Sequence, residues 1–221
     1  LRMDADTTRR KDDHEKILTA FAEGEADILI GTQMIVKGHD FPNVTLVGIL
    51  AADLSLFSED YRAAEKTFQL LLQAEGRAGR GEKPGEAVIQ TYRPDHYSIQ
   101  TAASQDYEVF YEAEIGYRML MDYPPAAAMA AVRGTCRDPE LLEKGMEYCR
   151  RYVESIYKKG DLILIGPAPE PVSRIQDVYR MVIYMRHPDR ELLVRIKNSL
   201  ERYIAVNSGF QKMTIQFDFN V

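Results

Sequence analysis

The chain has 221 residues, of which 45% are hydrophobic and 28% charged, and its formal net charge is −6 at pH 7. This composition is typical of a soluble globular protein with one large or two medium domains, and no apolar run is long enough to cross a bilayer. Phosphate contacts dominate nucleic-acid affinity, so a chain this acidic is not expected to bind DNA through bulk charge alone. Any DNA contact must therefore be local.

The chain ends and the cysteines indicate a cytoplasmic protein. The sequence opens Leu-Arg-Met-Asp without a secretory leader, so we expect Leu1 to lie inside a longer protein. Cys136 and Cys149 are the only cysteines and are too far apart for a metal ribbon. We expect both to be reduced and structural.

The first hundred residues alternate strand-like and helix-like segments. Residues 1–3 resemble the end of a strand, and Thr7 or Thr8 can cap a helix at residues 9–23. A short apolar strand of the buried parallel kind follows at residues 27–31.

The same alternation continues through a second strand at residues 44–50, a long helix that Ser58 can cap, and a third strand at residues 86–92. Asp53 follows the second strand directly. This order predicts a three-layer α/β lobe around a parallel sheet, with ligand-binding groups at the carboxyl ends of the strands.

The second half predicts a different domain. Helices at residues 95–104 and 105–121 end at Pro124-Pro125. The remaining order is β-α-β-β-α-β, the ferredoxin-like or split βαβ arrangement, with these segments: strand 126–136, helix 138–158, strand 162–165, strand 178–186, helix 188–204 and strand 213–219.

Alternating side chains in this domain predict a sheet with one apolar face, which packs on the helices. The other face carries Arg180, Tyr184, Arg186 and Gln216, and Asp218 interrupts it. Such a face can stack nucleic-acid bases, or it can be solvated or dock another domain. The sequence leaves these alternatives open.

Two arginines with neighbouring glycines are the strongest chemical signal. The segment Gln-Ala-Glu-Gly-Arg-Ala-Gly-Arg at residues 73–80 closes the long helix. Arg77 and Arg80 would lie on one side of the helix end, where Gly76 and Gly79 allow close backbone approach. Guanidinium groups suit a polyphosphate, although the same residues also suit an ordinary helix C-terminus.

A second motif decides between these interpretations. A strand ending Gly31-Thr32-Gln33 is followed by Lys-Gly-His-Asp-Phe-Pro-Asn-Val at residues 37–44. Together the two stretches resemble motifs V and VI of superfamily 2 helicases. With residues 2–8, 52–54, 90–92 and 94–96, they resemble most closely the bacterial replication-restart helicases of the primosomal protein N′ family. Glu75 departs from this resemblance, which implies a small or apolar residue there.

The resemblance implies the C-terminal half of such a helicase. Residues 1–103 would form a truncated RecA-like lobe 2, residues 104–125 a connecting helix, and residues 126–221 the ferredoxin-like C-terminal domain. The fold class is therefore α/β followed by α+β. The implied function is ATP-dependent, 3′-to-5′ DNA unwinding at stalled replication forks, for replication restart and primosome assembly.

Site residues carry over from the motifs. Arg80 would be the arginine finger on the γ-phosphate, with Arg77 beside it and Gln73 positioning the attacking water or the arginines. The resemblance also places Gly38, Asp40 and Gly76 near the nucleotide, and Thr32, Gln33 and Lys37 on the DNA backbone.

The sequence contains no phosphate loop and no Asp-Glu pair after a strand. ATP and Mg²⁺ would therefore be bound mainly by another lobe, and the chain alone should be inactive. The family carries zinc upstream, which no residue here can bind.

The implied partners are branched or single-stranded DNA, primosome proteins and the acidic tail of the single-stranded-DNA-binding protein, without a membrane. We expect Arg190 to bind that tail. The alternative is that Arg190 lies in the first turn of a helix and pairs with Asp189 or Glu191. The implied location is the cytoplasm, with the nucleoid. Two alternatives are a related branch-migration or transcription-repair translocase, and a non-enzymatic adaptor with a helicase-like scaffold.

Overall fold

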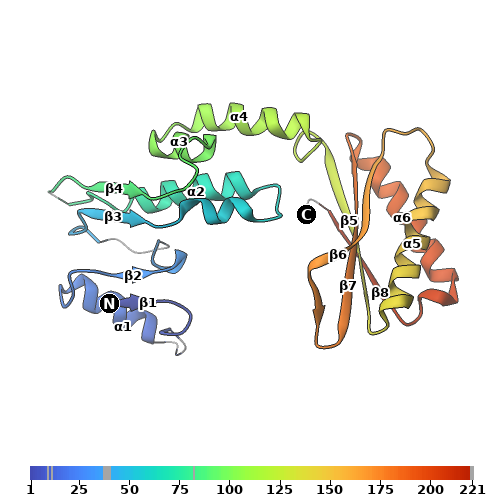
Figure 1. Ribbon diagram of the computed structural model, residues 1–221, viewed down its shortest axis with the longest axis horizontal. Coiled ribbons are helices and arrows are strands. Elements are labelled where there is room, and N and C mark those ends of the chain that lie inside the picture. Colours follow the sequence, from blue (N-terminus) through green and yellow to red (C-terminus); the bar gives the residue numbers. More distant parts are fainter. Residues whose placement is uncertain (9, 11, 37–40, 82, 220–221) are drawn as a thin grey trace. The chain divides into compact units, whose positions relative to one another are not determined.

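The computed structural model describes residues 1–221 except 9, 11, 37–40, 82 and 220–221. Its contacts divide the chain into two compact units, Leu1–Glu114 and Ile115–Val221 (Figure 1). Along the described residues, no helix combines the length and apolar character that a bilayer crossing requires.

The first unit holds two pairs of parallel strands. Strand β1 (Arg2–Met3) pairs with β2 (Ile30–Gly31), and β3 (Leu46–Ile49) pairs with β4 (Glu86–Ile89). The predicted parallel pairing is confirmed, but the described strands form two separate two-stranded sheets. The expectation that residues 27–31 are buried is wrong, because Ile30 is 65% exposed and only its last two residues are strand.

The helices of this unit are α1 (Asp13–Ala22), α2 (Ala63–Glu75), α3 (Tyr97–Ala103) and the first part of α4 (Tyr107–Leu120), whose last residues belong to the second unit. The unit also has 3₁₀ helices at Gln33–Val36 and Ala52–Phe57. Both predicted caps are wrong. The hydroxyls of Thr7 and Thr8 donate to the Asp4 carbonyl and close a turn instead. Ser58 follows the second 3₁₀ helix, and α2 begins after it.

Aromatic stacking holds α2, α3 and α4 together in the first unit. The rings of Phe68 and Phe110 stack with their centroids 4.0 Å apart, and both side chains are buried. Ile99 and Ala102 of α3 belong to the same apolar cluster. The last turn of α2 is thereby held close to α3.

The second unit has the predicted β-α-β-β-α-β order. Its antiparallel sheet has the strand order β6-β7-β5-β8. The elements are β5 (Ala128–Cys136), α5 (Pro139–Ile156), β6 (Ile163–Ile175), β7 (Val178–His187), α6 (Arg190–Val206) and β8 (Thr214–Phe219). The ferredoxin-like class is confirmed, because the fourth strand lies beside the first and the first beside the third.

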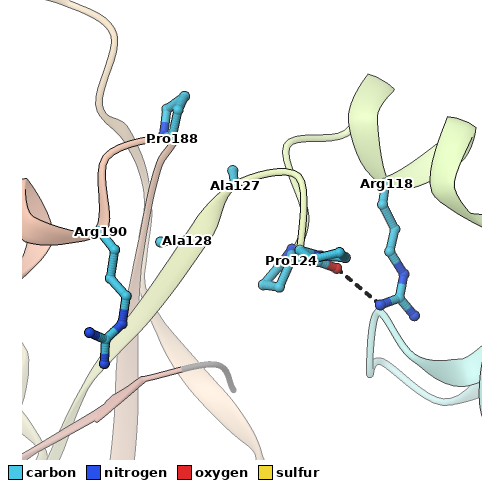
Figure 2. A pocket seen from close by; sticks show the side chains of 7 residues that line it. Arg118, Pro124, Ala127, Ala128, Pro188 and Arg190 are labelled. Carbon is cyan, nitrogen blue, oxygen red and sulfur yellow. Dashed lines mark hydrogen bonds between the residues drawn. The ribbon is translucent and has the colours of Figure 1, made fainter.

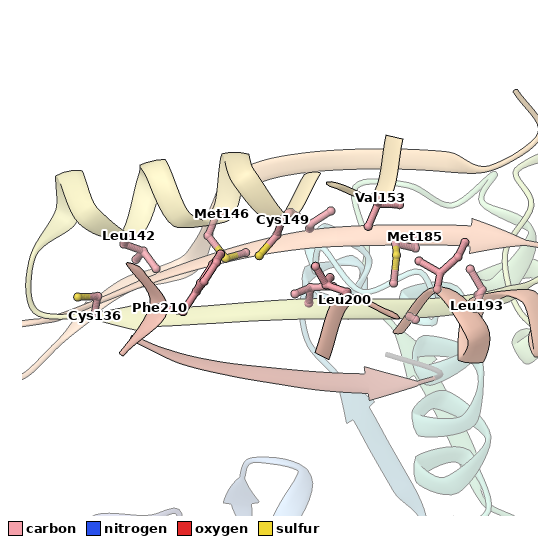
Figure 3. Close-up of a cluster of buried hydrophobic side chains, with 13 residues drawn as sticks. Cys136, Leu142, Met146, Cys149, Val153, Met185, Leu193, Leu200 and Phe210 are labelled. Carbon is pink, nitrogen blue, oxygen red and sulfur yellow. The ribbon is translucent and has the colours of Figure 1, made fainter. Parts of the chain in front are cut away.

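Both helices cover one face of this sheet, where Leu142, Met146 and Cys149 of α5 point toward the strands (Figure 3). Asp138 and Asp189 cap α5 and α6 by accepting backbone N–H bonds. Cys136 and Cys149 are buried free thiols. Burial in apolar surroundings raises the pKa of Cys149 to about 12, as expected of an unreactive structural thiol.

Strand β6 is much longer than predicted, since it runs ten residues beyond Ile165 to Ile175. Its register with β7 shifts between Ile165 and Ala168 and again between Pro169 and Arg174. Pro167, Pro169 and Pro171 explain the shortened prediction, because proline cannot donate to a strand ladder. The strand tolerates them because it lies at the sheet edge.

Candidate functional site

Backbone contacts bring the two sequence motifs together. The Gly79 N–H donates to the Val44 carbonyl at 3.0 Å. A Cβ on Gly81 would lie 2.2 Å from the Pro42 carbonyl oxygen, so the backbone segments around residues 42 and 81 are in direct contact. Of the predicted residues in the earlier motif, Lys37, Gly38 and Asp40 lie outside the described residues, as does His39.

Residues 76–81, here called the arginine loop, leave the end of α2 in a tight turn. The helix ends at Glu75, so Arg77 and Arg80 lie beyond it and not on its last turn as the sequence suggested. The Arg77 N–H donates to Ala74 and the Ala78 N–H to Glu75. The loop geometry therefore depends directly on the last carbonyls of α2.

The two arginines differ in their surroundings. Arg77 is half-buried, whereas Arg80 is exposed and its Nε donates to the Gly76 carbonyl at 2.6 Å. This bond complements the helix C-terminus, as the simpler interpretation of the sequence proposed. It also places the Arg80 guanidinium close to the backbone contact between Gly79 and Val44.

Glycine is required at two positions, 79 and 85, where the arginine loop packs against the residues that lead into β4. Gly79 has φ +71°, and a Cβ there would lie 2.6 Å from the Gly85 nitrogen. A Cβ on Gly85 would lie 2.0 Å from the Gly79 nitrogen. Gly76 is different, because its φ is −63° and the nearest atom to an added Cβ is the Leu72 carbonyl oxygen at 3.3 Å. The expectation of close backbone approach therefore holds at Gly79 and is weaker at Gly76.

The remaining predicted residues are on the surface. Gln73 is exposed near the end of α2, and Thr32 and Gln33 are exposed where β2 passes into its 3₁₀ helix. That 3₁₀ helix packs against α2. A Cβ on Gly31 would lie 2.4 Å from the Met3 carbonyl oxygen, which ties the start of this segment to β1.

Asp53 organises the carboxyl ends of β3 and β4. It is only 3% exposed and accepts bonds from the Thr91 hydroxyl at 3.0 Å and the Tyr92 N–H at 3.1 Å. The Tyr92 N–H is the main cause of its lowered pKa. The sequence placed Asp53 after a strand but gave no signal for this contact with residues 90–92.

Glu75 is a buried carboxyl beside the arginine loop. Its side chain is 8% exposed, and within the described residues Oε1 has no hydrogen-bond partner. Burial raises its pKa, and a hydrogen bond from the Gln105 side chain opposes this only in part. The sequence marked Glu75 as unusual but did not predict its burial.

We expect Glu75→Gln to remove a pH dependence of folding stability. Because the folded-state pKa is raised, Glu75 contributes stability at low pH that is lost as the pH rises through the unfolded and then the folded value. At neutral pH the variant should be more stable than the parent by up to about 1 kcal/mol, since solvent screening limits the effect. Urea unfolding at pH 4 and pH 7 measures it, and an equal difference at both values would contradict it.

In the second unit, a pocket of about 450 Å³ contains Arg190. Figure 2 shows Arg118 and Arg190 with Pro124 between them. The Arg118 Nη1 donates to the Pro124 carbonyl at 3.0 Å. The lining is otherwise apolar: Pro124, Pro125, Ala127, Ala128 and Pro188.

The alternative for Arg190 was an ion pair with Asp189 or Glu191. Among the described residues, both of these carboxylates pair instead with Arg195. The Arg190 guanidinium lies over the Phe219 ring, 5.5 Å from its centroid. It thus remains part of the pocket wall.

The arginines on the uncovered sheet face are bound within the domain. The buried Glu170 carboxylate bridges Arg133 at 2.7 Å and Arg180 at 2.6 Å, and Asp218 also pairs with Arg133. Arg186 donates to the Met121 carbonyl and lies over the Tyr123 ring. This compensation reduces the attraction of the face for phosphates.

The described residues contain no group of three or more His, Cys, Asp or Glu side chains arranged to hold a metal ion. The side-chain donors at the arginine loop are the guanidinium groups of Arg77 and Arg80, while the backbone N–H groups of residues 76–79 already donate to backbone carbonyls. The guanidinium groups fit phosphate oxygens, and they do not fit a divalent cation.

Family models define the class of both units. Residues 2–82 match the helicase conserved C-terminal domain, and residues 119–220 match the primosomal protein N C-terminal domain. The first match covers both motifs and the arginine loop. The chain is therefore a helicase C-terminal lobe followed by a ferredoxin-like primosomal domain.

Relatives identify the particular family. Replication restart protein PriA of Bacillus subtilis is 48% identical over 92% of this chain, that of Synechocystis 40% over 91%, and that of Haemophilus influenzae 40% over 87%. The chain belongs to the PriA family. It spans about a quarter of the length of these relatives, at 25%, 24% and 26% respectively.

Among solved structures, a de novo designed protein covers 43% of this chain and 97% of its own length, with a TM-score of 0.35 and 10% identity. This similarity is too low to bear on fold or function.

Proposed function

We propose that the chain supplies the arginine-finger side of an ATP site in a replication-restart DNA helicase. The contact between the two motifs, through the Gly79 N–H and the Val44 carbonyl, is the observation that carries this proposal. It sets the arginine loop beside the segment that would touch both nucleotide and DNA. Family membership supports the same assignment.

In this proposal, ATP and Mg²⁺ are bound mainly by a second lobe outside this chain, which supplies the phosphate loop and metal ligands. Arg80 contacts the γ-phosphate, Arg77 supports it, and Gln73 orients the attacking water or the arginines. A guanidinium stabilises the negative charge that develops during phosphoryl transfer. Gly76, Gly38 and Asp40 complete the nucleotide contacts.

Thr32, Gln33 and Lys37 would contact the DNA backbone. One segment would then contact both the DNA and the ATP site. Closure of the two lobes on ATP would therefore move the DNA-binding residues of one lobe relative to those of the other. This gives hydrolysis a route to translocation, with the 3′-to-5′ polarity that the family resemblance implies. The protein would work in the cytoplasm, at the nucleoid, on branched or single-stranded DNA with primosome proteins.

DNA-stimulated ATP turnover by the full-length protein tests this function. The turnover should depend on the arginine loop, and above all on Arg80. A related translocase would share that dependence, but residues 119–220 match the primosomal domain and favour replication restart. A scaffold adaptor would show no such dependence.

The pocket that contains Arg190 is the proposed site for the acidic tail of the single-stranded-DNA-binding protein. Its proline and alanine walls accept an apolar residue, and Arg190 and Arg118 place positive charge beside them. A peptide that ends in an apolar residue with a free carboxylate matches both features.

We expect Arg190→Ala in the full-length protein to weaken binding of a labelled acidic tail peptide about tenfold, the loss of about 1.4 kcal/mol for one charge-assisted contact. Fluorescence anisotropy measures it. Arg195→Ala is the matched control, since Arg195 lies on the same helix and pairs with Asp189. Equal effects of both substitutions would argue against the pocket, as would undiminished binding of a peptide with an amidated C-terminus.

A further inference from the structure

Three side chains of the second unit connect the end of α5 to the start of α6. The Tyr157 hydroxyl donates to Asp161 Oδ1 at 2.7 Å, and His187 Nε2 lies 3.4 Å from Asp161 Oδ2. The Tyr157 and His187 rings meet edge to face, with their centroids 6.1 Å apart. On the other side of the imidazole, Nδ1 accepts the Asp189 N–H at 2.9 Å. Tyr157, Asp161 and His187 are here called the histidine bridge.

The bond from Asp189 fixes the position of the imidazole proton. A backbone N–H can only donate, so Nδ1 of His187 is the unprotonated nitrogen and Nε2 carries the hydrogen. That hydrogen faces the Asp161 carboxylate, which also accepts the Tyr157 hydroxyl. The Tyr157 hydroxyl is the main cause of the lowered pKa of Asp161, and His187 contributes to it. One arrangement of hydrogens therefore satisfies all of these contacts.

The histidine bridge ends at the turn that forms one wall of the Arg190 pocket. His187 is the last residue of β7, and Pro188 and Arg190 both line the pocket. Ala128, which also lines the pocket, is the partner of His187 in the sheet. The Asp189 N–H that His187 binds lies between the two lining residues of the turn, and the Asp189 side chain caps α6. The bridge thus controls the backbone from which Arg190 projects.

Folding stability alone does not account for the histidine bridge. The Asp161 side chain is 58% exposed, and interactions between exposed charged groups contribute little to stability. Pro188 has no N–H, so the Asp189 N–H is the first donor after the strand with which the turn can be fixed. What the bridge supplies is a defined geometry at residues 187–190.

We propose that His187, oriented by Asp161 and Tyr157, is a positioning residue that holds the turn at residues 187–190 and thereby keeps Arg190 ready to bind the acidic tail peptide. This inference rests on the proposed binding of that peptide at Arg190. Order that exists before binding lowers the entropy lost on binding. A residue that acts only through the turn can therefore raise the affinity for the peptide.

Two substitutions of His187 in the full-length protein separate its bond to Asp189 from the bulk of the ring. The probe is a labelled acidic peptide that ends in an apolar residue with a free carboxylate, and fluorescence anisotropy measures its affinity. We expect His187→Ala to weaken binding about fivefold, because the peptide must then order the turn. Asparagine can accept a backbone N–H two residues further on, which is the spacing here, so His187→Asn should stay within about twofold of the parent.

Asp161→Ala tests the bridge without a change at the turn itself. Because Asp161 is largely exposed, this variant should fold like the parent, and it keeps the inference testable even if His187→Ala does not fold. We expect a loss of affinity of about threefold, since the imidazole loses the group that sets its orientation and tautomer. The double variant Asp161→Ala/His187→Ala should be no weaker than His187→Ala alone. Glu154→Ala is the control, since it removes an exposed carboxylate that pairs with Arg150 along α5.

The Arg190→Ala background separates positioning of Arg190 from a general loosening of the domain. There His187→Ala should weaken binding by at most about twofold more, because the guanidinium that the turn positions is gone. A full fivefold loss in that background would contradict the inference. Parental affinity in both His187→Ala and Asp161→Ala would also overturn it, as would a His187→Asn variant as weak as His187→Ala.

The same measurements distinguish this failure from failure of the proposed binding site. If Arg190→Ala weakens binding while the bridge variants bind like the parent, only the positioning role is lost. If Arg190→Ala itself binds the peptide like the parent, the assignment of the pocket is wrong.

Discussion

Arg80→Ala in the full-length protein is expected to lower DNA-stimulated ATP turnover by about a thousandfold, while nucleotide binding is largely kept. The reason is that an arginine finger acts on charge that develops during transfer, and contributes less to the bound ground state. Arg80 is suited to this role because it is exposed at a loop held by backbone contacts on both sides. Its bond to the Gly76 carbonyl would be exchanged for phosphate oxygens.

Steady-state ATP hydrolysis with single-stranded DNA, and equilibrium binding of a labelled nucleotide, are the two measurements. Arg202→Ala is the matched control, since Arg202 is an exposed arginine on α6, in the other unit. Near-normal turnover of Arg80→Ala would remove the active-site assignment and leave the adaptor scaffold as the better interpretation. Loss of nucleotide binding together with turnover would instead indicate a ground-state contact.

Gly85→Ala is expected to lower ATP turnover about a hundredfold without touching any predicted catalytic residue. The added Cβ would lie 2.0 Å from the Gly79 nitrogen and 2.4 Å from the Ala78 carbonyl carbon, so backbone atoms must move. These atoms belong to the arginine loop, and a displacement of about 1 Å at a catalytic group costs on the order of a hundredfold.

Gly48→Ala is the control for this substitution. Gly48 lies in β3 of the same unit, and nothing lies within 4 Å of an added Cβ. It should keep parental turnover. If Gly85→Ala also kept parental turnover, the close packing of residues 79 and 85 would have no bearing on the arginines.

Sequence periodicity predicted the second unit well, for identifiable reasons. Asp138 followed by Pro139 marks a helix start by its capping chemistry, and both residues act as predicted. Alternation along residues 178–186 predicted which side chains face the helices, and Ile183 and Met185 are indeed buried in the core. Such local signals suffice where one domain buries its own apolar face.

The first unit was predicted less well because its local signals compete. Thr7 and Ser58 both look like helix caps, but the turn around Asp4 and the 3₁₀ helix at residues 52–57 take precedence. Ile30 reads as buried from its apolar neighbours, yet it is exposed within this chain. Burial depends on which elements cover a strand, and strand composition does not reveal them.

The features of the candidate site were also predicted unevenly from the sequence. The motif predicted close backbone approach at Gly79, which the structure has, but it did not predict the left-handed conformation of that residue. It could not predict the burial of Glu75, because burial depends on which elements pack against the end of α2, and the motif does not reveal them. The roles of Arg77, Arg80, Gln73 and Arg190 stay predictions until the variants are measured.

The prolines of β6 have a consequence for the behaviour of the protein in solution. An outer strand normally presents a row of N–H and C=O groups that can recruit a strand from another molecule. Pro167, Pro169 and Pro171 have no N–H to offer, and the register shifts beside them distort the strand further. This border of the sheet is thereby protected against edge-to-edge aggregation, at the crowded concentrations where a protein must remain dispersed to find its substrate.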